Sequence, residues 1–75
     1  MFHGVRPNGN ALRASRERQG LSLRKLGRQT HINHMRLWRI EMGLAHPSDA
    51  ELHRLAGALG EPIEEITRDD PQEKA

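Results

Sequence analysis

The chain has 75 residues, no cysteine, 29% charged residues and a net charge of +2. A domain of this size buries only about 60% of the surface of its unfolded chain, which leaves no room for a catalytic cleft on a separate scaffold. The lack of cysteine excludes disulfides and thiolate metal sites, no apolar run is long enough to cross a membrane, and no apolar stretch marks a secretory signal, so a cytoplasmic protein is expected.

The amino-terminal part is predicted to be an arm followed by a first helix. Residues 1–9 contain glycine and proline and little apolar repetition, which indicates a flexible arm. Asn10 is the predicted N-cap of a helix that runs to about Gln19, and Gly20 is the residue expected just past a helix end. Leu12 is the main inward-facing residue of this helix.

Two short helices joined by a tight turn are predicted between residues 21 and 43. Ser22 is the predicted N-cap of the first of them, and Gly27 lies on its inner face beside a leucine. Residues 30–32 leave room for a turn of about three or four residues, as in a helix-turn-helix, before Asn33 caps the next helix.

The helix predicted at about residues 33–42 has two different faces. Leu37, Ile40 and Glu41 follow the spacing of an inward-facing stripe. The opposite face holds no acidic residue and consists of Met35, Arg36, Trp38 and Arg39. A large basic surface of this kind favours a polyanion as its partner.

The remainder of the chain is predicted to form two more helices and a polar tail. Ser48 is expected to begin a helix that Gly60 ends, and its inner stripe is Leu52, Leu55, Ala56 and Leu59. Pro62 is expected to begin a short last helix with Ile63 and Ile66 facing inward, and residues 68–75 are expected to be disordered. The fold class is therefore all-α, a compact bundle of five short helices.

Charge is divided unequally along the chain. Residues 1–47 hold nine Lys or Arg and two acids, a net charge of +7, whereas residues 48–75 hold three Lys or Arg and eight acids, a net charge of −5. This division predicts that one end of the molecule attracts phosphate and the other end is repelled by it.

Cations also lie where a helix disfavours them. Arg24 and Lys25 fall in the first turn after Ser22, where the helix dipole is unfavourable for positive charge, and Lys25 takes the place of the acid of a capping box. A phosphate bound at this helix end would relieve the conflict. The alternative is that both side chains are simply solvated at a small cost.

The chain resembles the phage repressor and Cro-like (XRE-type) helix-turn-helix family. The resemblance lies in residues 20–43 and in the closing pattern of residues 52–60. The resemblance is carried by Gly20-Leu21-Ser22, Leu26, Ile32, Leu37, Ile40-Glu41-x-Gly43, Pro47 and Leu-x-x-Leu-Ala-x-x-Leu-Gly. It implies a lambda repressor-like DNA-binding domain over residues 10–67, with the helix at about 33–42 as the recognition helix.

The resemblance implies roles for individual residues. Arg16 and Glu41 match a structural ion pair of the family. The first residues of the recognition helix read base edges in that family, so the base-contact candidates are Asn33, His34, Met35, Arg36 and Arg39. The candidates for contacts with DNA phosphates are Leu23, Arg24, Lys25, Arg28, Trp38 and His46. Leu23 departs from the usual glutamine, Gly27 from the usual alanine and Trp38 from a small or polar residue.

Several of these residues have two interpretations. Arg39 either binds a guanine through two of its guanidinium nitrogens or binds a phosphate, and for Arg36 a phosphate contact is favoured. His34 either contacts a base or is solvated, and Met35 is a candidate for a thymine methyl group. Trp38 packs on the DNA backbone, forms a protein interface or folds onto the core edge, and these three stay open.

Metal binding and catalysis are not predicted. His31 and His34 are three residues apart but lack a third ligand at a suitable spacing, so no metal and no cofactor are expected. No trio of nucleophile, base and acid is evident, so an enzyme is not expected.

The leading hypothesis is a sequence-specific double-stranded DNA-binding regulator of transcription. One recognition helix reads few base pairs, so a homodimer on a near-palindromic site is expected, with half-sites about 10 base pairs apart or a multiple of that. The resemblance implies dimerisation through the last helices. Two alternatives use the same fold: an adaptor that binds a protein partner, and an antitoxin that represses its own promoter.

Overall fold

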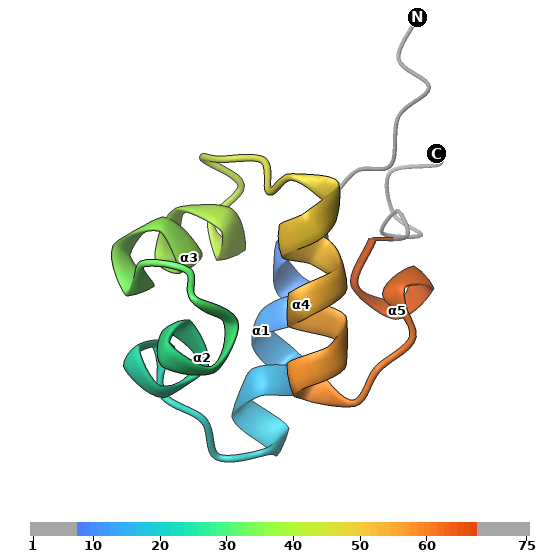
Figure 1. The fold of residues 1–75 in the computed structure, drawn as a ribbon. Helices are drawn as coiled ribbons and strands as arrows, with labels where there is room; N and C mark the ends of the chain where they lie inside the picture. Colours follow the sequence, from blue (N-terminus) through green and yellow to red (C-terminus); the bar gives the residue numbers. More distant parts are fainter. Residues whose placement is uncertain (1–7, 68–75) are drawn as a thin grey trace, which may run out of the picture.

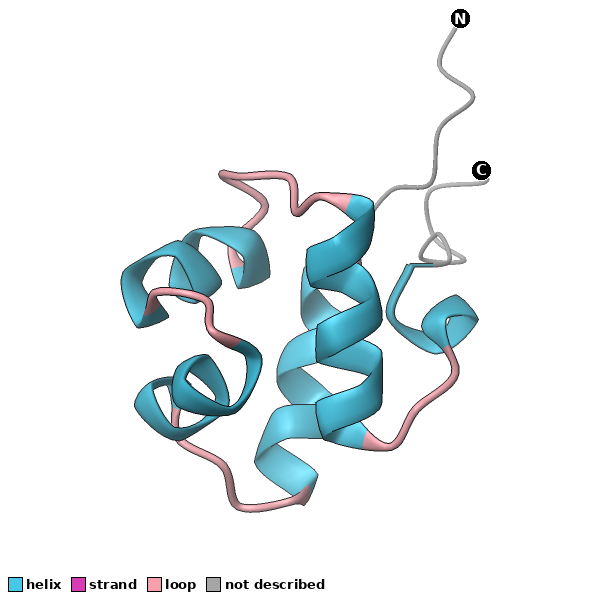
Figure 2. Cartoon of the chain, in the orientation of Figure 1, coloured by secondary structure: helices cyan, strands magenta, loops and turns pink. Residues whose placement is uncertain are grey.

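The computed structural model describes residues 8–67, which form five helices and no strand (Figures 1 and 2). The helices are α1 (Gly9–Arg18), α2 (Leu23–Thr30), α3 (His34–Glu41), α4 (Asp49–Leu59) and α5 (Ile63–Thr67). The predicted all-α fold with five short helices is confirmed. The disorder predicted for residues 68–75 and most of the predicted arm lie outside the described residues.

The helices are arranged around α1 and α4. Helix α2 packs against α3 and α4, α3 packs against α1, and α5 packs against α1 and α4. In Figure 1, α2 and α3 therefore lie on one side of the molecule and α5 lies on the other. The two helices predicted to bind DNA thus share a side that the last helix does not reach.

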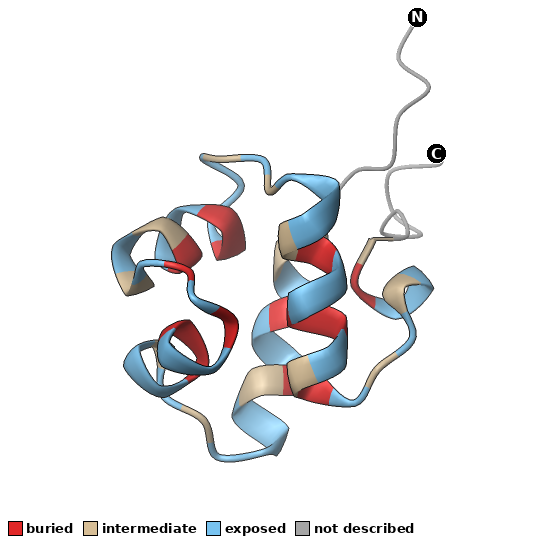
Figure 3. Cartoon of the chain, in the orientation of Figure 1, coloured by how far each residue is buried: buried red, intermediate tan, exposed pale blue. Residues whose placement is uncertain are grey.

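The core is formed by the predicted inward-facing stripes (Figure 3). Every helix contributes at least one apolar side chain, and the turn between α2 and α3 contributes one more. The buried apolar residues are Leu12, Leu26, Ile32, Leu37, Ile40, Leu52, Leu55, Ala56, Leu59 and Ile66. Helix α3 is held by this core along one side only, so its other side is exposed to solvent.

The start of α1 differs from the prediction. The N-cap is Asn8, whose side-chain Oδ1 accepts a hydrogen bond from Ala11 N at 3.1 Å, and Asn10 is an exposed residue within the helix. The predicted cap was wrong because tertiary contacts extend the helix. The Asn8 amide donates to the carbonyl of Ile66 in α5 at 2.7 Å, and a Cβ at Gly9 would overlap the backbone of Glu41.

The other predicted N-caps are confirmed, whereas Thr30, which was predicted to lie in the turn, is the last residue of α2. Ser22 Oγ accepts from Lys25 N at 3.0 Å, and Asn33 Oδ1 accepts from Met35 N at 2.8 Å. Ser48 caps α4, where Glu51 completes a capping box that the prediction did not include.

Candidate nucleic-acid interface

The turn between α2 and α3 packs directly on the backbone of α2. The amide of Ile32 donates to the carbonyl of Gly27 at 3.1 Å, and a Cβ at Gly27 would lie 2.6 Å from the carbonyl oxygen of Ile32. His31 has φ 60°, the left-handed conformation that reverses the chain after α2. Gly27 thus sets how closely α3 follows α2.

Helix α4 stabilises the end of α2. The Nε of Arg54 donates to the carbonyl oxygen of Thr30 at 2.8 Å, which places a cation at the carboxyl end of the helix, where the dipole favours it. The hydroxyl of Thr30 donates to the carbonyl of Leu26 at 2.8 Å. Local sequence patterns do not predict this contact, because Arg54 and Thr30 are 24 positions apart.

An ion pair joins α1 to the end of α3. Arg16 Nε donates to Glu41 Oε2 at 2.7 Å and Arg16 Nη2 donates to Glu41 Oε1 at 3.1 Å. Arg16 also donates to the carbonyl of Leu21 at 2.8 Å, and only 11% and 3% of the Arg16 and Glu41 side chains are exposed. The hydrogen bonds to Glu41 raise the pKa of Arg16 above its ordinary value. The pair that the family resemblance implies is therefore present, and it fixes the back of α3.

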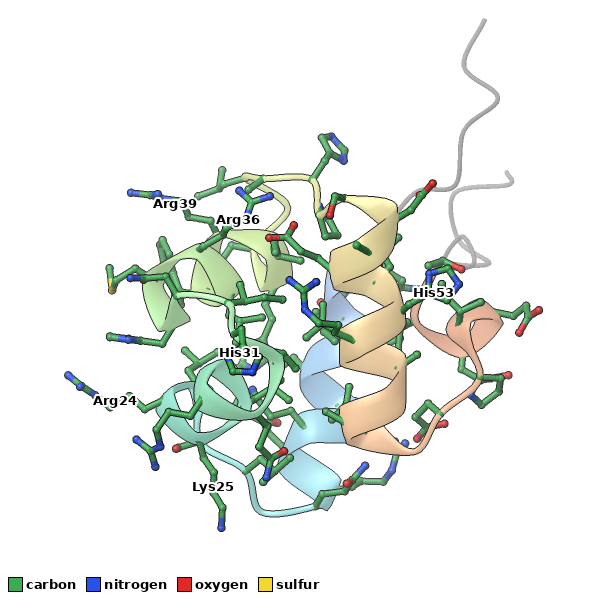
Figure 4. All side chains as sticks on the ribbon, in the orientation of Figure 1. Arg24, Lys25, His31, Arg36, Arg39 and His53 are labelled. Carbon is green, nitrogen blue, oxygen red and sulfur yellow. The ribbon has the colours of Figure 1, made fainter. Side chains whose placement is uncertain are left out.

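A second bidentate ion pair changes the interpretation of Arg36. Its Nε donates to Glu51 Oε2 at 3.1 Å, and its Nη2 donates to Glu51 Oε1 at 3.0 Å and to the carbonyl of His46 at 3.0 Å. The sequence placed Arg36 on a face without acids. That placement was incomplete, because the partner acid comes from the first turn of α4. Figure 4 shows the Arg36 side chain near α4, while Arg39 points away from the bundle.

The pair between Arg36 and Glu51 also perturbs both titrating groups. The hydrogen bonds from Arg36 hold the pKa of Glu51 below its ordinary value, helped by the amide of Ser48, which donates to Glu51 Oε1 at 2.9 Å. The same hydrogen bonds raise the pKa of Arg36. One carboxylate thus completes the α4 capping box and holds an arginine of α3.

Four cations on α2 and α3 have no ion-pair or hydrogen-bond partner among residues 8–67, and all four are exposed. They are Arg24, Lys25, Arg28 and Arg39. In Figure 4 the labelled side chains of Arg24, Lys25 and Arg39 extend into solvent on the side of α2 and α3. These cations make this side attractive to phosphate because no acid among the described residues neutralises them.

A shallow groove of about 260 Å³ runs between α2 and α3. Its lining combines two of the unpaired arginines with the start of α3, namely Arg24, Gly27, Arg28, His31, Ile32, Asn33 and His34. Leu23 is half-buried and packs its side chain against the core, so any phosphate contact at that position would come from its backbone N–H. The ring of His46 is exposed beyond α3.

The outer side of α3 is partly apolar. Met35 is 52% exposed, Trp38 is 42% exposed and Met42 is 54% exposed. Trp38 therefore keeps a large part of its surface exposed, which is compatible with each of its three interpretations. His34 is half-buried, and the side-chain oxygen of Asn33 is occupied as the N-cap of α3.

The described residues offer no other obvious chemistry. No group of three His, Cys, Asp or Glu residues in residues 8–67 could hold a metal ion. None of the five helices is long and apolar enough to cross a membrane. The acids Glu64 and Glu65 lie on α5, away from α2 and α3 (Figure 1).

Comparisons with known proteins agree with this geometry. The sequence matches the family described as a helix-turn-helix domain over residues 9–68. No curated protein sequence matches the chain significantly.

Solved structures of regulators have the same fold. The restriction-modification controller protein C.AhdI from Aeromonas hydrophila has a TM-score of 0.73 and 28% identity, covering 76% of this chain and 86% of that chain. The clp gene regulator ClgR from Corynebacterium glutamicum has a TM-score of 0.71 and 31% identity, covering 73% of this chain and 58% of that chain. The SinR protein/SinI protein complex shares the fold, with a TM-score of 0.76 and 24% identity. The match covers 89% of this chain and 65% of that chain.

The match covers most of the sequence and all five helices. Together with the similar regulators, it supports a DNA-binding regulator of transcription. The chain belongs to the helix-turn-helix domain family, in the fold of the phage repressor and Cro-like, XRE-type, regulators.

Proposed function

We propose that this protein is a sequence-specific regulator of transcription that inserts α3 into the major groove of double-stranded DNA. The observation that carries the proposal is the group of four exposed, unpaired cations around α2 and α3. Helix α3 is braced from behind by the core and by ion pairs to α1 and α4. Its exposed side is therefore a rigid surface, as DNA reading requires.

Phosphate contacts come from α2 in this proposal. Arg24, Lys25 and Arg28 are exposed and unpaired, and the free N–H of Leu23 lies at the amino end of the same helix, where the dipole favours an anion. His46 is exposed and is a candidate for a contact with the DNA backbone, and Trp38 on the outer side of α3 is a candidate for a contact with either the backbone or a base.

Base contacts come from the outer side of α3. Arg39 is the strongest candidate for a guanine, because its guanidinium is exposed and has no partner among the described residues. Met35 lies one turn before it, and Asn33 and His34 flank the start of the helix. We assign Arg36 to bracing α3 against Glu51 instead of reading bases, since both of its carboxylate contacts are already made.

A homodimer on a near-palindromic site is part of the proposal. Two half-sites about 10 base pairs apart would double the number of bases read, which a single eight-residue helix needs for useful discrimination. Helix α5, with half-buried Ile63, is the proposed contact between the two copies.

Duplex binding measured at several salt concentrations tests the function. With the three cations of α2 assigned to phosphates, the logarithm of affinity should fall with the logarithm of salt with a slope of about −3 per protomer. An adaptor that uses Met35, Trp38 and Met42 for a protein partner would not bind duplex DNA appreciably. Absence of salt-dependent binding would contradict the proposed function.

Two variants separate the proposed base contact from the proposed phosphate contacts. Sequences selected from a random duplex pool define the preferred site. Arg39→Ala should relax preference at one base position, at a cost of about 1–3 kcal/mol in the selected site. Lys25→Ala should weaken binding to all duplexes alike and reduce the salt slope by about one. Uniform weakening by both variants would show that Arg39 binds phosphate.

A further inference from the structure

Three exposed side chains lie next to one another on the outer side of α3. Met35, Trp38 and Arg39 are spaced at i, i+3 and i+4, which places them on adjacent positions of one helical face. Met35 and Trp38 are 52% and 42% exposed although both are large and apolar. The face that the proposed function turns toward DNA thus combines one free cation with two apolar side chains.

Some of the hydrogen-bonding groups around this face are already occupied within the protein. Arg36 is bidentate to Glu51, and the side-chain oxygen of Asn33 accepts from the amide of Met35. His34 is half-buried. Among the described residues of α3, Arg39 is the exposed side chain that carries several donors and has no protein partner.

The cations beside this face favour DNA as its occupant over an apolar protein surface. Arg24, Lys25, Arg28 and Arg39 are exposed and have no partner among the described residues; the first three lie on the neighbouring helix α2 and Arg39 lies on α3 itself. A protein partner would have to supply a carboxylate for each of them, whereas a duplex supplies phosphates along the groove edge.

The major groove offers an apolar side chain one specific partner. Base edges there carry hydrogen-bond donors and acceptors, and their apolar group is the C5-methyl of thymine. 5-Methylcytosine carries a methyl at the same ring position. We propose that Met35 and Trp38 select 5-methylpyrimidines by nonpolar contact with this methyl group, beside a base contact from Arg39. The inference rests on the proposed function and names what its recognition helix reads.

Replacing thymine by uracil in the selected duplex tests the inference, because uracil pairs like thymine and lacks only the methyl group. Affinity should fall about fourfold for each contacted methyl, the effect of losing one buried methylene equivalent. Uracil outside the selected site serves as the control and should change nothing. Salt-dependent binding that is equally tight for thymine and uracil at every position would overturn the inference and leave the proposed function standing.

Protein variants identify the residues that contact the methyl group. Met35→Ala or Trp38→Ala should abolish the difference between thymine and uracil at one position each, and Met35→Leu should retain it. Leu44→Ala is the matched control, since Leu44 is an apolar residue that is 67% exposed but lies in the loop after α3. A thymine preference that persists unchanged in both Met35→Ala and Trp38→Ala would overturn the assignment, and failure of the unchanged protein to bind any duplex would instead refute the proposed function.

Discussion

Two glycines within helices differ in the space around them. Gly27 is buried in α2, where a Cβ would lie 2.6 Å from the carbonyl oxygen of Ile32. Gly57 is exposed in α4, where a Cβ would meet nothing within 4 Å. Alanine is the usual residue of the family at the first position, and its absence here goes together with a turn that packs on the helix backbone.

Gly27→Ala should therefore destabilise the protein although alanine is the better helix former. The turn must move away from α2 to admit the methyl group, at a cost of about 1–3 kcal/mol in the free energy of unfolding. Gly57→Ala is the control and should stabilise the protein by up to about 1 kcal/mol. Urea unfolding of both variants measures the difference, and a stabilised Gly27→Ala variant would show that the turn has room for a side chain.

The helices are held at their ends by side chains from distant elements. Arg16 joins α1 to α3, Arg36 joins α3 to α4, and Arg54 joins α4 to α2. Each contact places a cation on a carboxylate or on a carbonyl at a helix end. The three contacts fix α2 and α3 relative to the central helices, which is what keeps the outer side of α3 in one orientation.

Removing one partner of the buried pair should be costly. Arg16→Met would leave Glu41 buried without a counter-charge, which destabilises a protein by about 3–5 kcal/mol. Adding Glu41→Leu should recover much of this loss, because an apolar pair replaces the ion pair. Thermal and urea unfolding compare the single and double variants.

The exposed pair of α1 provides the control for that experiment. Arg13 and Glu17 form an ion pair at 3.1 Å with 58% and 55% of their side chains exposed, so Arg13→Ala should change the free energy of unfolding by less than about 1 kcal/mol. Equal losses in Arg13→Ala and Arg16→Met would mean that burial does not set the contribution of these pairs.

Acid should weaken the contact between α3 and α4. The pKa of Glu51 is lowered in the folded protein, so its carboxylate stabilises the fold above the ordinary glutamate pKa of about 4.3, and that contribution is lost as pH falls through the folded-state value. Glutamine retains the capping box but not the charge. Near pH 7 the Glu51→Gln variant should be less stable than the unchanged protein, with a difference in the free energy of unfolding of up to about 1 kcal/mol. The difference should vanish in acid, and a constant difference across pH would contradict the assignment.

Charge is distributed across the whole molecule, with the unpaired cations on α2 and α3 and the acids of α5 on the opposite side (Figure 1). The net charge of +2 therefore describes neither side. An approaching polyanion meets the local field of the nearer side, since charges farther away than about 8–10 Å are largely screened at physiological salt.

Removing acids from α5 should consequently leave DNA affinity nearly unchanged at physiological salt. The double variant Glu64→Gln and Glu65→Gln raises the net charge by two, yet the affected side faces away from the duplex. Arg24→Gln with Arg28→Gln lowers the net charge by two on the nearer side and should reduce affinity strongly. Fluorescence anisotropy with one duplex compares them, and equal and opposite changes would mean that net charge, not its placement, controls binding.

Much of the fold follows from local sequence patterns. The apolar stripes at helical spacing and the caps Ser22, Asn33 and Ser48 predicted the five helices, because both signals depend on neighbours within a few residues. The start of α1 was predicted two residues late, because the contacts of Asn8 with α5 and of Gly9 with α3 join distant parts of the chain.

The candidate interface divides in the same way. The sequence by itself determined which residues share the outer side of α3 and that the surrounding charge is positive, since helical periodicity and composition are local properties. Only the tertiary structure decided which of those cations are free. Arg36 and Glu51 are 15 residues apart and meet because the fold brings the first turn of α4 within reach of the Arg36 side chain, whereas Arg39 stays free on an outer side that also holds Met35 and Trp38. Pairing across elements depends on the three-dimensional packing, and no spacing along the chain encodes it.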